Sequence, residues 1–345
     1  MEDDEEKAEM KTAMFYENVG AKVRCHLCNH NCMIKEGKRG VCGVRENRNG
    51  KLYSLVYGKA VSVGVDPIEK KPFFHFYPGT SSYSFATVGC NFHCLNCQNW
   101  KSSQMPKGKG GSIIGEDLQP EGIVSEAKGL GCKTIAYTYT EPTIFFEYAY
   151  DTAKLAHKEG IKNLFVTNGY TSSEAIRKIA PFLDAANVDL KSFDEDFYRE
   201  VCGAKLQPVL DNIRLYKELG VRVEVTTLII PGYNEDENQL KEIAELIKEV
   251  GDEIPWHITA FYPAFKLLDV PATPVESLRK ARDIGLNAGL RYVYEGNVPG
   301  EGGENTYCSN CGELSIERSG FNIRRNKLVD GRCPKCQVKM RGVGL

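Results

Sequence analysis

The chain has 345 residues, enough for one α/β barrel of about 200 to 250 residues with additions at its ends. Its 44 basic and 46 acidic residues give a formal net charge of −2, so the composition offers no support for a nucleic acid partner. No apolar run approaches the ~20 residues of a membrane span, and the acidic stretch 1–6 is unlike a secretory signal. We therefore expect a cytoplasmic protein without a membrane partner.

Cysteine is the residue type that stands out, with thirteen copies. Thiols stay reduced in the cytosol, so clustered cysteines there indicate metal ligands rather than disulfides. Cys132 and Cys202 stand alone in patterned segments, and we predict that both are small buried residues without a ligand role. The remaining cysteines fall into three clusters: Cys25, Cys28, Cys32 and Cys42; Cys90, Cys94 and Cys97; and Cys308, Cys311, Cys333 and Cys336.

Taken in chain order, the sequence divides into three parts. Residues 1–75 form an N-terminal cysteine-rich module, with a strand pair predicted over 51–65. Over 76–300, β-rich runs alternate with helical patterns, of which 238–250 is the clearest. Residues 301–345 form a C-terminal module that resembles a zinc ribbon. The strands predicted in the middle part are 83–88, 134–140, 163–167, 187–190, 222–230 and 256–262.

This alternation predicts an α/β fold, namely a partial (β/α)6 TIM-like barrel with cysteine-rich metal-binding modules at both ends. Each predicted strand runs into a polar or glycine-containing loop. In βα-barrels such loops gather on one face and build the active site. We therefore expect the functional residues in these loops.

The loop after the first predicted strand carries three cysteines, Cys90, Cys94 and Cys97. A closed structural metal site needs four protein ligands, whereas an iron-sulfur cluster with three leaves one iron open to a substrate. Gly89 lets the chain turn tightly before the first of these cysteines. The alternatives are a zinc site completed by His93 and a redox-active pair of cysteines.

The Cys-x3-Cys-x2-Cys loop resembles the signature of the radical SAM superfamily. Other segments resemble pyruvate formate-lyase activating enzymes, and the N-terminal part is similar to the AmmeMemoRadiSam-system radical SAM enzymes. The activating-enzyme segments are Cys97-Gln98-Asn99, Tyr139-Thr140-Glu141-Pro142, Thr167-Asn168-Gly169, Asp189-Leu190-Lys191 and Ile230-Pro231-Gly232-Tyr233-Asn234. The N-terminal segments are Cys25 to Cys42 and Asp66-Pro67-Ile68-Glu69-Lys70-Lys71-Pro72.

The resemblance implies that Cys90, Cys94 and Cys97 hold a 4Fe-4S cluster whose open iron binds S-adenosylmethionine (SAM). An electron from a donor such as ferredoxin or flavodoxin would split SAM into methionine and a 5′-deoxyadenosyl radical, which takes hydrogen from a substrate. Thr140 and Glu141 match a Gly-Gly-Glu-Pro segment that would hold the SAM amino group, although Tyr139 and Thr140 replace its glycines. The alternative for Glu141 is an acid that stabilises a helix start.

Four further residues are implied as SAM contacts. Asp189 and Lys191 match an Asp-x-Lys that would contact the methionyl and ribose groups, with an ordinary ion pair as the alternative. Asn168 is either a ligand or a turn residue. Tyr262 lies near a position that often bears His in the family, and its alternative is a core aromatic residue.

The two flanking cysteine clusters predict further metal sites. The C-terminal cysteines have the spacing of a four-cysteine zinc ribbon, for which we favour zinc over a second iron-sulfur cluster. The N-terminal cysteines, with His26 and His30 as spare ligands, are compatible with zinc or with an auxiliary iron-sulfur cluster. We favour zinc there, although spacing alone does not decide between the two.

Three hypotheses for function follow. The first is a radical SAM enzyme that acts on a protein, by analogy with activating enzymes. The second keeps this chemistry but takes a small molecule or an RNA base as substrate. The third is a zinc-binding interaction module without catalysis, against which the three-cysteine loop counts.

Overall fold

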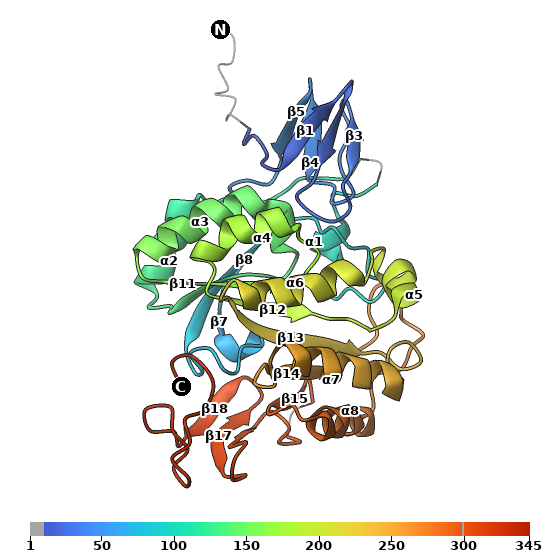
Figure 1. Cartoon of the computed structure of the whole chain (residues 1–345). Helices are drawn as coiled ribbons and strands as arrows, with labels where there is room; N and C mark the ends of the chain where they lie inside the picture. The colour runs from blue at the N-terminus through green and yellow to red at the C-terminus, as the bar shows by residue number, and fades with distance from the viewer. Residues whose placement is uncertain (1–9, 109, 299) are drawn as a thin grey trace.

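Eight strands form the central sheet in the part of the chain that the computed structural model describes, residues 10–108, 110–298 and 300–345 (Figure 1). Residues 1–9 of the predicted N-terminal module, and residues 109 and 299 of the predicted barrel, lie outside it. All neighbouring strands are parallel except at one edge, where β7 is antiparallel to β8. In spatial order the strands are β15 (Val293–Gly296), β14 (Trp256–Ala260), β13 (Arg222–Ile229), β12 (Ala185–Asp189), β11 (Lys162–Thr167), β10 (Thr134–Tyr137), β8 (Ser81–Ala86) and β7 (Ser62–Pro67).

This sheet confirms the predicted partial barrel, with all six predicted strands present, and adds two strands to it. The sequence does not predict β15, because four residues are too few to show a period. The prediction for 51–65 is a single strand pair. Instead, β5 (Lys51–Ser54) pairs with β4 (Arg45–Arg48), and β7 joins the large sheet. The barrel sheet therefore begins upstream of residue 76.

Helices connect the parallel strands and pack on the sheet (Figure 1). Helix α7 matches the predicted 238–250, and the Asp236 carboxylate caps it by accepting hydrogen bonds from the amides of Asn238 and Gln239. The helices are α1 (Trp100–Gln104), α2 (Pro120–Gly129), α3 (Phe146–Lys158), α4 (Ser173–Ile179), α5 (Glu195–Phe197), α6 (Gln207–Glu218), α7 (Glu237–Gly251) and α8 (Val275–Ala288). Shorter turns are η1 (Ile68–Lys70), η2 (Pro142–Phe145), η3 (Ala180–Phe182) and the π-helical η4 (Tyr198–Cys202).

Two small β modules flank the barrel, and Figure 1 shows them at opposite ends of the molecule. The N-terminal module contains the β4–β5 hairpin and a three-stranded sheet, and a separate strand pair links it to the barrel. The C-terminal module is a three-stranded antiparallel sheet. The remaining strands are β1 (Tyr16–Val19), β2 (Lys22–Cys25), β3 (Met33–Lys35), β6 (Lys59–Ala60), β9 (Glu116–Asp117), β16 (Thr306–Tyr307), β17 (Leu314–Ser319) and β18 (Asn322–Asn326).

The C-terminal module is fixed to the barrel by a buried arginine. Arg318 on β17 donates to the Phe74 carbonyl at 3.1 Å, and its guanidinium carbon lies 4.2 Å from the centroid of the Phe74 ring. Its Nε lies 3.6 Å from the Glu69 carboxylate, and both side chains are fully buried. Among the described residues, no helix is both long and apolar enough to cross a membrane.

Candidate functional site

A cavity opens inside the half-barrel and reaches the loops at the carboxyl ends of its parallel strands. Residues from β11, β12, β13, β14 and β15 line it, together with the loops after β8 and β10 and with residues of the segment 66–72. Most of the predicted site residues meet in this lining: Cys90, Cys94, Cys97, Thr140, Glu141, Asn168, Asp189 and Lys191.

The three cysteines of the loop after β8 all line this cavity and are half-buried. Gly89 precedes them with φ +103°, and a Cβ there would lie 2.6 Å from Val44 Cγ1 and 3.0 Å from the Cys42 carbonyl oxygen. Only glycine fits this approach of the two loops. The Phe92 amide donates to Cys90 Sγ at 3.3 Å, and Ser103 Oγ lies 3.3 Å from Cys97 Sγ.

The surroundings of this loop do not supply a histidine as a fourth ligand. His93 packs against Gly203, where a Cβ would lie 3.2 Å from its Cδ2, and is absent from the described lining of the cavity. His257 does line the cavity, but its Nε2 lies 2.6 Å from Glu224 Oε2, and both side chains are buried. The geometry therefore gives no support to a zinc site completed by His93.

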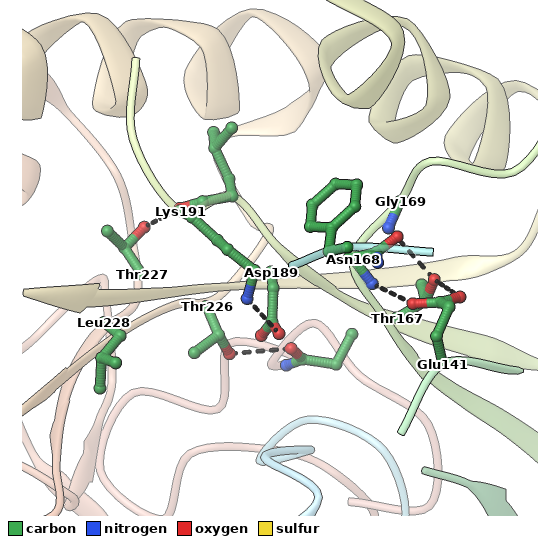
Figure 2. Close-up of polar contacts among 12 residues, drawn as sticks. Glu141, Thr167, Asn168, Gly169, Asp189, Lys191, Thr226, Thr227 and Leu228 are labelled. Atoms are coloured by element: carbon green, nitrogen blue, oxygen red, sulfur yellow. Dashed lines mark hydrogen bonds and ion pairs between the residues drawn. The ribbon is translucent and has the colours of Figure 1, made fainter. Parts of the chain in front are cut away.

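Glu141 is buried, and four hydrogen bonds hold its carboxylate. Oε1 accepts from the Thr143 amide at 3.0 Å, from Thr143 Oγ1 at 2.6 Å and from Thr167 Oγ1 at 2.8 Å. Oε2 accepts from the Asn168 amide at 2.8 Å (Figure 2). Glu141 thus caps η2, as its structural alternative predicts, and also joins the loops after β10 and β11. Burial raises the pKa of Glu141, although these hydrogen bonds oppose the rise.

Asn168 ties the loop after β11 to the cysteine loop. Its Nδ2 donates to Asn91 Oδ1 at 2.7 Å and lies 3.9 Å from Cys90 Sγ, while its Oδ1 accepts from the Tyr170 amide at 3.1 Å. The positive φ of this turn is at Gly169, not at Asn168. Asn91 could not be predicted from the sequence, because no local pattern links it to a residue 77 positions away.

Asp189 and Lys191 form an ion pair within the cavity lining, with Lys191 Nζ 2.9 Å from Asp189 Oδ2 (Figure 2). Burial by itself lowers the pKa of Lys191, but the Asp189 carboxylate raises it well above its ordinary value. The ammonium group therefore stays protonated. The neighbouring thiol of Cys202, together with burial, raises the pKa of Cys94.

Tyr139 occupies the place where the family segment has glycine, and its φ is +63°. Its carbonyl accepts from Asn99 Nδ2 at 2.7 Å, which connects the loop after β10 to the start of α1. Its hydroxyl donates to Asp66 Oδ2 at 2.5 Å, and Lys71 Nζ lies 4.3 Å from its ring centroid. The segment 66–72 therefore holds a strained tyrosine in a glycine-like conformation.

The structure does not bring Tyr262 to the other predicted contacts. Strand β14 ends at Ala260, so Tyr262 lies in the loop that follows. Its side chain is 48% exposed, its hydroxyl donates to the Asn297 carbonyl at 2.9 Å, and it is absent from the described lining of the cavity. Thr140 does line the cavity, but its Oγ1 donates to the Thr87 carbonyl at 2.9 Å.

The flanking cysteine clusters differ in geometry. The C-terminal sulfur atoms of Cys308, Cys311, Cys333 and Cys336 all lie within 4.8 Å of one another, and two of the pairs are separated by 3.6 Å. The N-terminal Cys25, Cys28, Cys32 and Cys42 line one small cavity between the N-terminal module and the barrel. No three of these N-terminal cysteines, all of them described, meet the 4.8 Å spacing.

Comparison with known proteins gives consistent results. The model of the Radical SAM superfamily matches residues 85–254. An uncharacterized protein of Methanocaldococcus jannaschii is 49% identical over 331 residues, which cover 95% of this chain and 97% of that protein. The pyruvate formate-lyase-activating enzyme of Clostridium pasteurianum is 23% identical over 60% of this chain and 89% of its own length. A radical SAM methyltransferase structure from Sphaerobacter thermophilus is 17% identical, with a TM-score of 0.49 over 69% of this chain and 71% of that chain.

Proposed function

Because this chain belongs to the radical SAM superfamily, we propose that it cleaves SAM reductively at a 4Fe-4S cluster held by Cys90, Cys94 and Cys97. The radical produced would remove a hydrogen atom from a protein substrate. The observation that carries the proposal is the meeting of these three thiols with Asn168 and the Asp189–Lys191 pair in the lining of one cavity. The superfamily itself implies both SAM and the cluster.

The donor set fits a cluster with one open iron. Three soft thiol ligands on one loop face the cavity, and its described lining contains no fourth cysteine. When bound, the cluster supplies the electron for reductive cleavage of SAM. The Phe92 amide and Ser103 Oγ both lie within hydrogen-bond reach of these sulfur atoms, and such contacts tune a cluster's potential.

The polar residues of the lining have separate roles in this proposal. The protonated Lys191 and the Asp189 carboxylate offer opposite charges to the zwitterionic methionyl part of SAM, and the carboxylate can accept hydrogen bonds from the ribose hydroxyls. The Glu141 carboxylate already accepts four hydrogen bonds within the protein, so we assign it a positioning role. It keeps Asn168, and through Asn168 the cysteine loop, in place.

Replacement of Glu141 by glutamine tests that positioning role. The glutamine oxygen can keep the hydrogen bonds that Oε1 now accepts, but its amide group would then face the Asn168 amide, donor against donor. An unsatisfied buried donor costs about 1–3 kcal/mol. Relief of this clash would move Asn168 and with it the cysteine loop. We therefore expect SAM to bind roughly tenfold more weakly, which is about 1.4 kcal/mol of binding free energy.

Equilibrium dialysis with SAM on the reconstituted protein measures this change. Glu121→Gln is the matched control, because Glu121 is an exposed acid in the first turn of α2. If Glu141→Gln bound SAM as tightly as the wild-type protein, Glu141 would not be a positioning residue.

We place the protein substrate at the open mouth of the cavity. Phe321, in the turn between β17 and β18, lines the cavity, yet its side chain is 43% exposed. An exposed aromatic residue at the rim can hold a peptide segment above the site. The relatives named activating enzymes support a protein substrate. For the electron donor we propose a ferredoxin- or flavodoxin-class protein. The C-terminal module that carries Phe321 is, in this proposal, closed by zinc, whose tetrahedral thiolate sites have sulfur atoms about 3.8 Å apart.

The proposed chemistry is tested by product analysis. Protein purified without oxygen and reconstituted with iron and sulfide is reduced with dithionite in the presence of SAM, and 5′-deoxyadenosine is quantified by liquid chromatography. We expect 5′-deoxyadenosine from the reconstituted protein and none from the same protein before iron and sulfide are added. An iron-loaded, reduced protein that yields no 5′-deoxyadenosine would contradict the proposal.

A further inference from the structure

The four N-terminal cysteines line one cavity, and the two nearby histidines contact other groups. Besides the thiols of Cys25, Cys28, Cys32 and Cys42, the lining is largely apolar, with Leu27, Ile34, Val41 and Ile144 among its residues. His30 lines it too, but its Nε2 lies 2.8 Å from the Asn91 carbonyl oxygen. His26 Nε2 lies 3.7 Å from the Glu174 carboxylate. The site therefore offers four thiols, and the one histidine in its described lining has Nε2 against a backbone carbonyl.

The spacing of these thiols differs from that of the C-terminal group. One zinc ion with Zn–S bonds of about 2.3 Å brings its four sulfur atoms to about 3.8 Å from each other. The C-terminal cysteines meet this requirement, with pairs at 3.6 Å. In the described residues no other group of three or more cysteines, histidines or carboxylates has its ligand atoms within 4.8 Å of one another. This holds for the N-terminal cysteines and for the triad of Cys90, Cys94 and Cys97.

Each thiolate of a 4Fe-4S cluster binds a different iron atom, so its sulfur ligands lie farther apart than ligands of a single ion. Like the triad, the described N-terminal cysteines contain no three sulfur atoms within 4.8 Å of one another. Their arrangement is therefore compatible with a cluster and differs from that of the C-terminal group.

We infer that Cys25, Cys28, Cys32 and Cys42 hold a second 4Fe-4S cluster, closed by four thiolates, directly beside the loop of Cys90. This reverses the preference for zinc at these cysteines that we reached from the sequence. Because four protein ligands leave no iron open, this cluster cannot bind SAM. We therefore assign it one-electron transfer. A ferredoxin- or flavodoxin-class protein would be the donor and the site at Cys90 the acceptor.

The position of the four cysteines suits such a transfer. Cys28 and Cys32 are partly exposed, whereas Cys25 and Cys42 are buried. The Cys42 carbonyl oxygen lies 3.0 Å from the Cβ position of Gly89, which immediately precedes Cys90. The cluster would therefore have one side toward solvent and the other against the loop of the proposed SAM site.

Metal analysis of a variant without the triad tests this inference independently of SAM cleavage. The variant Cys90→Ser, Cys94→Ser, Cys97→Ser is reconstituted without oxygen and analysed for iron, sulfide and zinc. We expect about four irons and four sulfides per chain, with one zinc at the C-terminal group. Its reduced electron paramagnetic resonance spectrum should not change when SAM is added, because no iron is open.

A triad variant that binds no iron and about two zinc ions per chain would overturn the inference. The zinc at the C-terminal group reports whether this variant folds. If the triad variant does not fold, the metal content of the wild-type protein is measured instead. About eight irons per chain would support two clusters, whereas about four irons with two zincs would contradict the inference. The complementary variant Cys28→Ser, Cys32→Ser is expected to lose about four irons and keep the others.

Discussion

Replacement of Cys94 by serine is expected to reduce the formation of 5′-deoxyadenosine below detection and to remove about four irons per chain. Cys94 is the middle ligand of the proposed cluster, and its side chain lines the cavity. A serine hydroxyl is a hard, weakly acidic ligand that does not replace a thiolate on iron. With only two thiolates left on the loop, the cluster loses its attachment.

Two variants make this measurement specific. Cys132→Ser places the same hydroxyl at another buried cysteine, which lies outside the lining of both cysteine cavities, and we expect it to keep wild-type activity. Cys94→Ser with Cys202→Ser also removes the buried thiol next to Cys94, so that no nearby cysteine can replace the lost ligand. Wild-type production of 5′-deoxyadenosine by this double variant would show that Cys94 is not a ligand.

The barrel could be predicted from sequence because its strands are locally encoded. The parallel strands are buried on both faces and appear as short apolar runs, each followed by a turn. The pairing of β7 could not be predicted in this way. Its residues alternate like those of any edge strand, and only the tertiary structure selects β8 as its partner.

In the site, too, features set by neighbouring residues could be predicted from the sequence, and features set by residues far apart in the chain could not. The cysteine loop is contiguous in sequence, and its spacing predicts its chemistry. Tyr139 is different, because its glycine-like φ depends on Asp66 and Lys71, about seventy positions upstream. The Asn91–Asn168 hydrogen bond is likewise long-range. Tyr262 is expected within the last predicted strand, 256–262. The observed strand β14 ends two residues earlier, at Ala260, so Tyr262 lies in the following loop.

Removal of the Glu147 carboxylate is expected to cost the protein about 3–5 kcal/mol of unfolding free energy. Arg45 Nη1 donates to both carboxylate oxygens of Glu147, at 2.9 and 3.1 Å, and both side chains are almost completely buried. Glu147 Oε1 also accepts from the Met14 amide at 2.6 Å. In Glu147→Ala the buried guanidinium loses the carboxylate that accepts two of its hydrogen bonds. Loss of one partner of a buried pair therefore costs more free energy than the intact pair contributes.

Urea unfolding of the reconstituted protein measures this loss. Glu159→Ala is the matched control at the end of the same helix, because Glu159 pairs with Lys128 at the surface and such pairs contribute about 0–1 kcal/mol. Arg45→Met with Glu147→Leu removes both charges and should recover most of the lost stability. Equal stability of the two alanine variants would contradict the argument. Because Arg45 follows Cys42 by three residues, Glu147→Ala should also release iron from the N-terminal site before it releases iron from the triad.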